Sequence, residues 1–170
     1  ACNQACLDHV FENKTASCLV NPRACAETQL NYTPVTHRKR IAVVGAGPAG
    51  LACATVAAQR GHAVTLFESA ARIGGQFNLA KRIPGKEEFE ETLRYFGSQL
   101  SAHNVDVRLG EVTGIDAAAR RITLAPPSPG TAAESLDYDY LVLASGARHA
   151  YFGHDEWSAD APGLKTLDDA

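Results

Sequence analysis

The sequence predicts an α/β fold with a parallel sheet, and three observations favour this fold class. A short apolar segment over residues 41–44 is followed directly by glycines in G-x-G-x-x-G spacing. A helix rich in small residues is predicted over 49–61, and a second apolar segment follows over 63–67. Another apolar segment lies at 140–144. A strand, a helix and a second strand in this order form a βαβ unit, whose two strands are parallel.

The glycines after the first predicted strand indicate what this unit binds. Gly45 allows a sharp turn from strand to helix, Gly47 leaves bare backbone for a pyrophosphate, and Gly50 lets the helix pack closely. Pro48 and Ala49 lie between the glycines and belong to the same predicted site. The helix N-terminus directs its unpaired N–H groups and positive dipole end at the phosphates. The alternative is a glycine turn in a βαβ unit without a ligand.

Glu68 closes the second predicted strand, 18 residues after Gly50. In a dinucleotide-binding unit, a carboxylate at this place accepts hydrogen bonds from the ribose hydroxyls of adenosine. The alternative is a solvated strand end with no ligand. Together with the glycines, Glu68 favours the first interpretation, so we predict a Rossmann-like, dinucleotide-binding domain.

Length and charge exclude several other classes of protein. The chain has 170 residues, and 16 basic against 19 acidic residues give a net charge of −3, which argues against nucleic acid as a partner. No apolar run approaches the ~20 residues of a membrane-spanning helix, so a soluble cytoplasmic protein without a transmembrane segment is expected. Because the sequence contains no methionine and opens at Ala1, we expect it to be part of a longer protein.

Four of the five cysteines lie within residues 1–25, at Cys2, Cys6, Cys18 and Cys25. A disulfide framework is one interpretation, but a chain with a large core in a reducing compartment has little need of it. The C-x3-C-x11-C spacing suits thiolates around an iron–sulfur cluster better than tetrahedral zinc. Such a cluster needs four ligands, and Cys25 is a possible fourth.

The stretch ACNQACLDHVFENKTASCLVNPRACAET resembles the iron–sulfur segment of NADPH-dependent 2,4-dienoyl-CoA reductases and related NADH:flavin oxidoreductases. In that family one more cysteine lies three residues before the position of Cys2. The resemblance implies that Cys2, Cys6 and Cys18 are ligands of a 4Fe-4S cluster, with one ligand missing upstream, and that Cys25 is not a ligand.

The same resemblance continues to about residue 100. It implies an FAD-binding domain over residues 41–146, preceded by an iron–sulfur segment over 1–25 and a polar linker over 26–40. Residues 147–170 are expected to begin the following segment. Within the linker, the basic run HRKR at 37–40 is interpreted as a solvated approach to the first strand.

A second glycine pair, in the loop Ile73-Gly74-Gly75-Gln76, lets backbone approach a ligand. Gly75, Gln76 and Lys86 are candidates to contact the phosphates or ribityl hydroxyls of the flavin. For Lys86 the alternative is the first turn of a surface helix predicted over 87–100. That helix carries one apolar stripe, formed by Phe89, Leu93, Phe96 and Leu100.

The second half of the chain adds a third strand over 105–109 and an antiparallel meander over 115–124 and 136–140. By resemblance, the backbone at Val112 meets the adenine. The last strand ends at Ala144-Ser145-Gly146, which resembles a second flavin-contact motif. Because ligands of open α/β sheets bind at the carboxyl ends of strands, Ala144, Ser145 and Gly146 are expected to lie near Gly45 and Glu68.

Residues 105–170 also resemble a different family, the type II NADH:quinone dehydrogenases, which share the flavin-binding fold but use FAD without iron–sulfur cysteines. His149, His154 and Trp157 lie in this part, and loop packing is preferred to metal binding for them.

In the small-residue helix, Cys53 is expected to be buried as a small hydrophobe.

The resemblance to the dienoyl-CoA reductases implies an NAD(P)H-dependent flavoprotein oxidoreductase. Electrons pass from NADPH through FAD and the cluster to FMN, which reduces an enoyl-CoA. No second G-x-G-x-x-G and no FMN-binding barrel are present, so NADPH and FMN are expected only in the full-length protein. No side chain is assigned as a catalytic acid or base. The alternatives are the FAD domain of a type II dehydrogenase and an inactive nucleotide-binding fragment.

Overall fold

The computed structural model describes residues 5–18, 20–126, 128, 130–147 and 150–161. The helices and strands follow in the order α1 (Ala5–Phe11), β1 (Arg40–Val44), α2 (Pro48–Gln59), β2 (Ala63–Glu68), α3 (Phe77–Ala80), α4 (Phe89–Ala102), β3 (Asp106–Leu109), β4 (Val112–Asp116), β5 (Arg121–Leu124), β6 (Ser135–Asp137), β7 (Tyr140–Leu143) and the 3-10 helix η1 (Asp155–Ala159). The predicted α/β fold, a parallel sheet with an antiparallel meander, is confirmed.

The parallel sheet has the strand order β3-β2-β1-β7. β1 pairs in parallel with β2 on one side and with β7 on the other, so that Val43 lies between Leu66 and Val142. The last strand in the chain thus lies beside the first. Because all the strands run in one direction, the carboxyl ends of β1, β2 and β7 meet at one edge of the sheet.

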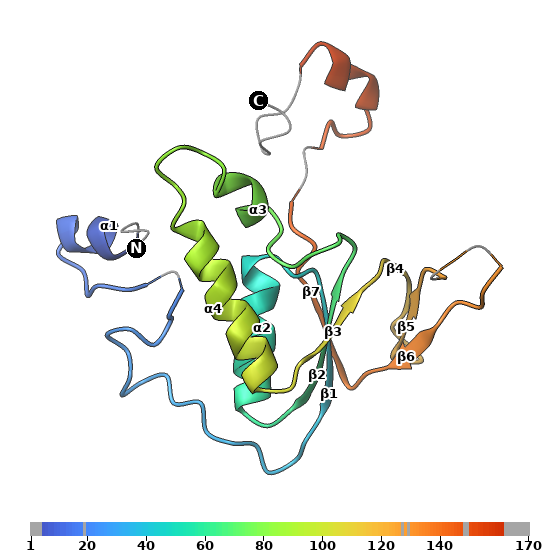
Figure 1. Ribbon diagram of the computed structural model, residues 1–170, viewed down its shortest axis with the longest axis horizontal. Helices are drawn as coiled ribbons and strands as arrows, with labels where there is room; N and C mark the ends of the chain where they lie inside the picture. The colour runs from blue at the N-terminus through green and yellow to red at the C-terminus, as the bar shows by residue number, and fades with distance from the viewer. Residues whose placement is uncertain (1–4, 19, 127, 129, 148–149, 162–170) are drawn as a thin grey trace.

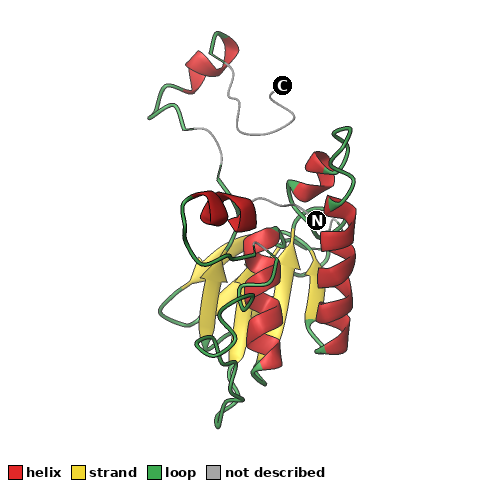
Figure 2. Cartoon of the chain, turned by 90° about the vertical axis from the view of Figure 1, so that its left-hand side faces the viewer, coloured by secondary structure: helices red, strands yellow, loops and turns green. Residues whose placement is uncertain are grey.

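The two faces of this sheet are covered by different elements. Helices α2 and α4 lie on one face, and the antiparallel sheet β4-β5-β6 lies on the other (Figures 1 and 2). Side chains alternate along a strand, so Val43 and Leu66 pack beneath the helices. The neighbouring Ala42 and Phe67 face the antiparallel sheet, where they pack with Ile122. Burial on both faces explains why β1 and β2 are almost continuously apolar.

Helix α2 begins with Pro48 at its first position, where the missing N–H costs no hydrogen bond. It ends at a Schellman motif, in which Gly61 has φ +96° and the His62 N–H donates to Ala57 O at 3.2 Å. Cys53 in this helix is only half-buried, which corrects the expectation of a buried thiol. Partial burial still raises the pKa of the Cys53 thiol.

Helix α4 begins at Phe89, two residues after the predicted start, and its predicted apolar stripe packs on the sheet. Leu93, Phe96 and Leu100 are buried, while Phe89 stacks against Phe77 of α3 with ring centroids 4.7 Å apart. At 14 residues α4 is the longest helix in the described part of the chain, where no helix is long and apolar enough to cross a membrane.

The meander differs from its prediction in where its strands begin and end. Residues 115–124 form two strands rather than one, because a turn separates β4 from β5. In that turn the Asp116 Oδ1 accepts a hydrogen bond from the Ala119 N–H at 2.8 Å, and Arg120 has φ +53°. An aspartate that bonds nearby backbone favours a turn over a continuing strand.

Leu66 and Leu109 offer a matched test of this core, since Leu66 is fully buried and Leu109 is 58% exposed. We expect Leu66→Ala to lower the free energy of unfolding by about 2–5 kcal/mol, the usual effect of opening a cavity in a core. Leu109→Ala should change it by no more than about 0.5 kcal/mol. Urea denaturation followed by circular dichroism measures both, and equal midpoints would contradict the core assignment.

Candidate functional site

A cavity of about 1070 Å³ opens at the edge where the carboxyl ends of β1, β2 and β7 meet. This volume lies at the upper limit of the ~300–1,000 Å³ that drug-sized ligands occupy. Most of the residues predicted for the cofactor line it, namely Gly45, Gly47, Pro48, Ala49, Glu68, Gly75, Gln76, Val112, Ala144, Ser145 and Gly146. The structure therefore brings together residues from positions 45 to 146 of the chain.

Two predicted residues lie outside the lining. Gly50 serves packing instead: a Cβ atom there would lie 1.8 Å from Gly45 O, so only glycine lets α2 approach the turn. Lys86 is partly buried in the turn before α4, where its N–H donates to Ile83 O at 2.9 Å. The contact between Lys86 and flavin stays a prediction.

Sequence reasoning missed several lining residues: Val44, Phe67, Ser69, Phe77, Gly110, Glu111 and Ala147. Most of them are direct neighbours of predicted residues, and this adjacency is the signal that could have found them. Phe67 gave a weaker signal, because an apolar residue at the end of a buried strand is usually part of the core.

The turn between β1 and α2 depends on glycine. Gly45 has φ +102°, and a Cβ atom there would lie 2.3 Å from Ala144 O. Gly47 differs, because no heavy atom lies within 4 Å of the place a Cβ would take, and its φ is −74°. Gly47 is thus free of steric conflict in the protein and borders the cavity at the N-terminus of α2. Such a helix N-terminus favours phosphate groups.

The Glu68 carboxylate, 9% exposed, is hydrogen-bonded to backbone on both oxygens. Its Oε2 accepts from the Ala46 N–H at 2.9 Å, and its Oε1 accepts from the Ala70 N–H at 3.0 Å. The Ser69 hydroxyl also donates to Oε1, at 3.4 Å. A carboxylate oxygen has about two lone-pair sites, so Oε2 keeps one for a further donor. Glu68 can therefore hold the glycine turn and still accept a hydrogen bond from a ligand.

The second glycine pair, Gly74 and Gly75, lies against the turn between β1 and α2. Gly74 has φ +120°, and its N–H donates to Ala46 O at 2.7 Å. A Cβ atom at Gly75 would lie 3.1 Å from the Gly47 Cα, so two stretches of bare backbone meet at this point. The cavity wall here consists of backbone atoms, which suits close approach by a phosphate.

The charges around the cavity have one sign. Glu68 and Glu111 line it, and the described lining residues include no lysine, arginine or histidine. A phosphate bound in this cavity would therefore depend on backbone N–H groups and on the dipole of α2 rather than on cationic side chains. An additional phosphate near Glu68 would be repelled.

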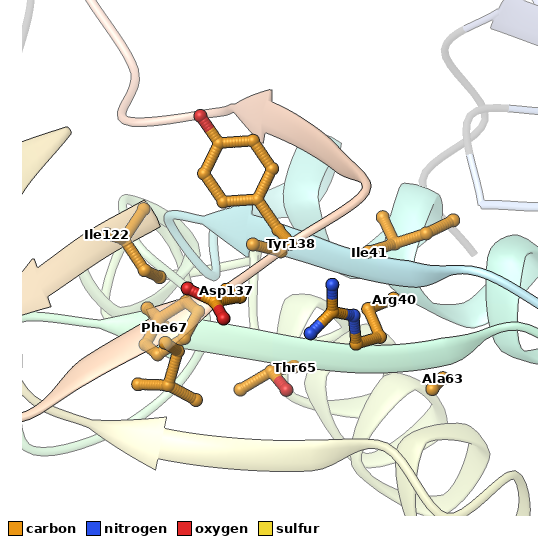
Figure 3. A pocket seen from close by; sticks show the side chains of 10 residues that line it. Arg40, Ile41, Ala63, Thr65, Phe67, Ile122, Asp137 and Tyr138 are labelled. Carbon is orange, nitrogen blue, oxygen red and sulfur yellow. The ribbon is translucent and has the colours of Figure 1, made fainter. Parts of the chain in front are cut away.

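A second, smaller cavity of about 140 Å³ lies between β1, β2 and the end of β6 (Figure 3). Its charged residues have partners elsewhere: Arg40 pairs with Asp139 at 3.4 Å and Asp137 with Arg121 at 2.8 Å. The hydrogen bond from Arg121 lowers the pKa of Asp137. With this volume and its charges already paired, this cavity is not a candidate for a dinucleotide.

The cysteine segment shows no metal site in the part that the structure describes. Cys2 lies outside the described residues, and Cys6 and Cys18 are free thiols. No group of three potential ligands comes together among the described residues, so they do not by themselves fit an iron–sulfur cluster. The Cys18 Sγ accepts a hydrogen bond from the Asn21 N–H at 3.4 Å, and Cys25 is exposed with φ +63°.

The aromatic and histidine residues near the end of the chain follow the packing interpretation. The ring of His154 stacks on Trp157, with centroids 4.3 Å apart and planes 7° from parallel. His154 also lies 3.1 Å from a carboxylate oxygen of Glu156. His149 lies outside the described residues.

The fold and cavity define a dinucleotide-binding domain of the Rossmann type. Residues 39–170 match the family of pyridine nucleotide-disulphide oxidoreductases, and the chain belongs to this family. The predictions of an NAD(P)H-dependent flavoprotein oxidoreductase and of FAD as cofactor are confirmed at the level of the family. The resemblance to 2,4-dienoyl-CoA reductases stays a prediction.

Three known proteins illustrate the range of the similarity. The chain is 52% identical to a metal reductase of Desulforamulus reducens over 107 residues, which make up 63% of the chain and 16% of the relative. It is 33% identical to the type II NADH:quinone oxidoreductase NdhA of Mycobacterium tuberculosis, over 80% of the chain and 28% of the relative. The solved structure of a 2-naphthoyl-CoA reductase with 2-naphthoyl-CoA superposes with a TM-score of 0.60 at 40% identity, covering 64% of the chain and 17% of that protein.

The chain spans less than a third of the length of each of these relatives. The family assignment and the FAD cofactor class therefore apply to this domain. The reaction of a whole protein depends on further parts.

The two glycines Gly45 and Gly47 should respond differently to the same substitution. Gly47→Ala should fold normally and weaken FAD binding at least about tenfold, because a methyl group would occupy space beside the phosphates. Gly45→Ala should instead lower the melting temperature, because both its φ and the distance to Ala144 O exclude a side chain. Flavin fluorescence titration and thermal melts measure these effects. A Gly47→Ala protein with unchanged FAD affinity would contradict the site.

Proposed function

We propose that this chain is the FAD-binding portion of an iron–sulfur flavoprotein oxidoreductase similar to 2,4-dienoyl-CoA reductase. In the full-length protein, Cys2, Cys6 and Cys18 would hold a 4Fe-4S cluster together with a further cysteine, and the cluster would supply one-electron transfer between FAD and an FMN that serves an enoyl-CoA substrate, with NAD(P)H as the electron donor. The observation that carries the FAD assignment is the cavity at the strand ends, where the glycine turn, Glu68 and Ala144 to Gly146 lie together. FAD supplies the redox chemistry when bound, and the protein binds and orients it.

Each wall of the cavity suits a different part of FAD. The N-terminus of α2 and the bare backbone at Gly47 and Gly75 suit the pyrophosphate. Glu68 accepts hydrogen bonds from the adenosine ribose, and Val112 borders the adenine. Ser145 and its neighbours at the end of β7 leave the remaining side of the cavity for the flavin half.

Support for an acyl-CoA substrate comes from the solved 2-naphthoyl-CoA reductase, which is 40% identical over the part compared. The second candidate is the FAD domain of a type II NADH:quinone dehydrogenase, supported by 33% identity over 80% of the chain. The two candidates share the flavin site and differ in the cysteine segment and in the electron acceptor. Iron content and a comparison of enoyl-CoA with quinone as acceptors separate them.

Cys18 and Cys25 test the iron–sulfur part of the proposal in the full-length protein. Cys18→Ser should lower the bound iron, because the resemblance makes Cys18 a ligand, and Cys25→Ser should leave it unchanged as the matched control. Iron analysis and the absorption spectrum of protein purified without oxygen measure this. A wild-type spectrum with flavin bands and no sulfur-to-iron shoulder would favour the type II dehydrogenase.

Glu68→Ala tests the ribose contact. Hydrogen bonds to charged groups contribute roughly 1.5–3 kcal/mol each, so FAD affinity should fall at least about tenfold. Titration of the apoprotein with FAD measures this fall. Glu134→Ala is the control, because Glu134 is an exposed carboxylate that pairs with Arg108 and is not among the residues lining the cavity.

The same carboxylate should exclude a phosphate on the ribose. In competition with FAD, AMP should bind the wild-type protein better than 2′,5′-ADP, which differs from it only by the 2′-phosphate, and Glu68→Ala should reduce this preference. Equal FAD affinity for wild type and Glu68→Ala would remove Glu68 from the site.

A further inference from the structure

A buried amide on α3 lies directly behind the second glycine turn. Asn78 is 9% exposed, and its Nδ2 donates a hydrogen bond to Ile73 O at 2.9 Å. It is not among the residues that line the cofactor cavity. Burying an amide costs free energy unless the amide is hydrogen-bonded. The bond from Asn78 to Ile73 O supplies that partner, and it spans the glycine turn on the side away from the cavity.

The turn held by Asn78 touches the glycine loop at two points. The Gly74 N–H donates to Ala46 O at 2.7 Å, and Gly75 approaches the Gly47 Cα, with 3.1 Å to the position of a Cβ. The turn is also enclosed from behind: a Cβ at Gly74 would lie 2.8 Å from Asn78 Nδ2. Movement of the turn therefore changes the wall beside the N-terminus of α2.

We propose that Asn78 is a positioning residue for the pyrophosphate of FAD. By fixing Ile73 O, it keeps Gly75 against Gly47, so that the bare backbone at this wall is in place before the cofactor arrives. The adenosine end of the cavity, around Glu68 and Val112, lies on β2 and β4. Ala46 joins Glu68 to the turn, but Glu68 is also held by the Ala70 N–H, so loss of the Asn78 bond should affect the pyrophosphate end more than the adenosine end. The proposal rests on the assignment of the cavity to FAD and goes beyond it by naming a residue outside the lining.

Substitution by aspartate removes the donor while leaving the size of the side chain almost unchanged. Asn78→Asp places a carboxylate oxygen opposite Ile73 O, and two acceptors cannot share a hydrogen bond. Asn31→Asp is a matched control, because the Asn31 Nδ2 also donates to a backbone carbonyl, that of Thr28 at 3.2 Å, in an exposed turn.

The test measures FAD affinity of the apoprotein by flavin fluorescence, with ADP and adenosine as competitors. Asn78→Asp should weaken FAD and ADP by about tenfold, the effect of one hydrogen bond of ordinary strength, and weaken adenosine less. Asn31→Asp should change none of the three. Asn78→Ser, whose side chain is too short to reach Ile73 O and carries no charge, is measured in the same way and also serves if Asn78→Asp does not fold. A loss with Asn78→Asp but not with Asn78→Ser would come from the added charge and would overturn the proposal.

The ratio of ADP to adenosine affinity separates positioning from general loosening of the fold. Equal losses for ADP and adenosine, or unchanged FAD affinity, would overturn the role of Asn78 while leaving the FAD site intact. Failure of the wild-type protein itself to bind FAD would overturn the proposed function and this inference with it.

Discussion

The cofactor site depends on the backbone N–H and C=O groups of Ala46. Its N–H donates to the Glu68 carboxylate at 2.9 Å, and its C=O accepts from the Gly74 N–H at 2.7 Å. Ala46 is fully buried, so neither bond competes with water. Through this one residue the turn after β1, the end of β2 and the turn before α3 are held in a single arrangement.

This arrangement is held by hydrogen bonds within the chain itself, and that has consequences for binding. Backbone fixed in advance does not lose conformational freedom when a cofactor binds, so more of the interaction energy appears as affinity. The strand ends are linked in the same way, since the Gly45 N–H donates to Phe67 O and the Ala144 N–H to Val44 O. The wall at the N-terminus of α2 therefore consists of backbone at Gly47 and Gly75, and Glu68 and Glu111 are the charged groups among the described lining residues.

A phosphate-binding wall built from backbone suits a domain that is shared by proteins with different reactions. Backbone N–H groups and a helix dipole recognise a pyrophosphate whatever reaction the flavin serves. The metal reductase, the quinone oxidoreductase and the naphthoyl-CoA reductase are each similar to 63–80% of this chain. A widely used fold of this kind does not by itself fix the reaction of the protein that carries it.

Local spacing in the sequence determined the βαβ unit, the glycine turn, Glu68 at the end of its strand and the motif at Ala144, because these features depend on residues close together in the chain. Tertiary structure decided which contacts join these features. The bond between Ala46 and Glu68 spans 22 positions. Gly50 packs against the turn, where a Cβ atom would lie 1.8 Å from Gly45 O, and it lies outside the lining. The amide of Asn78 carried no signal in the sequence, because its role arises only where the two glycine turns meet in space.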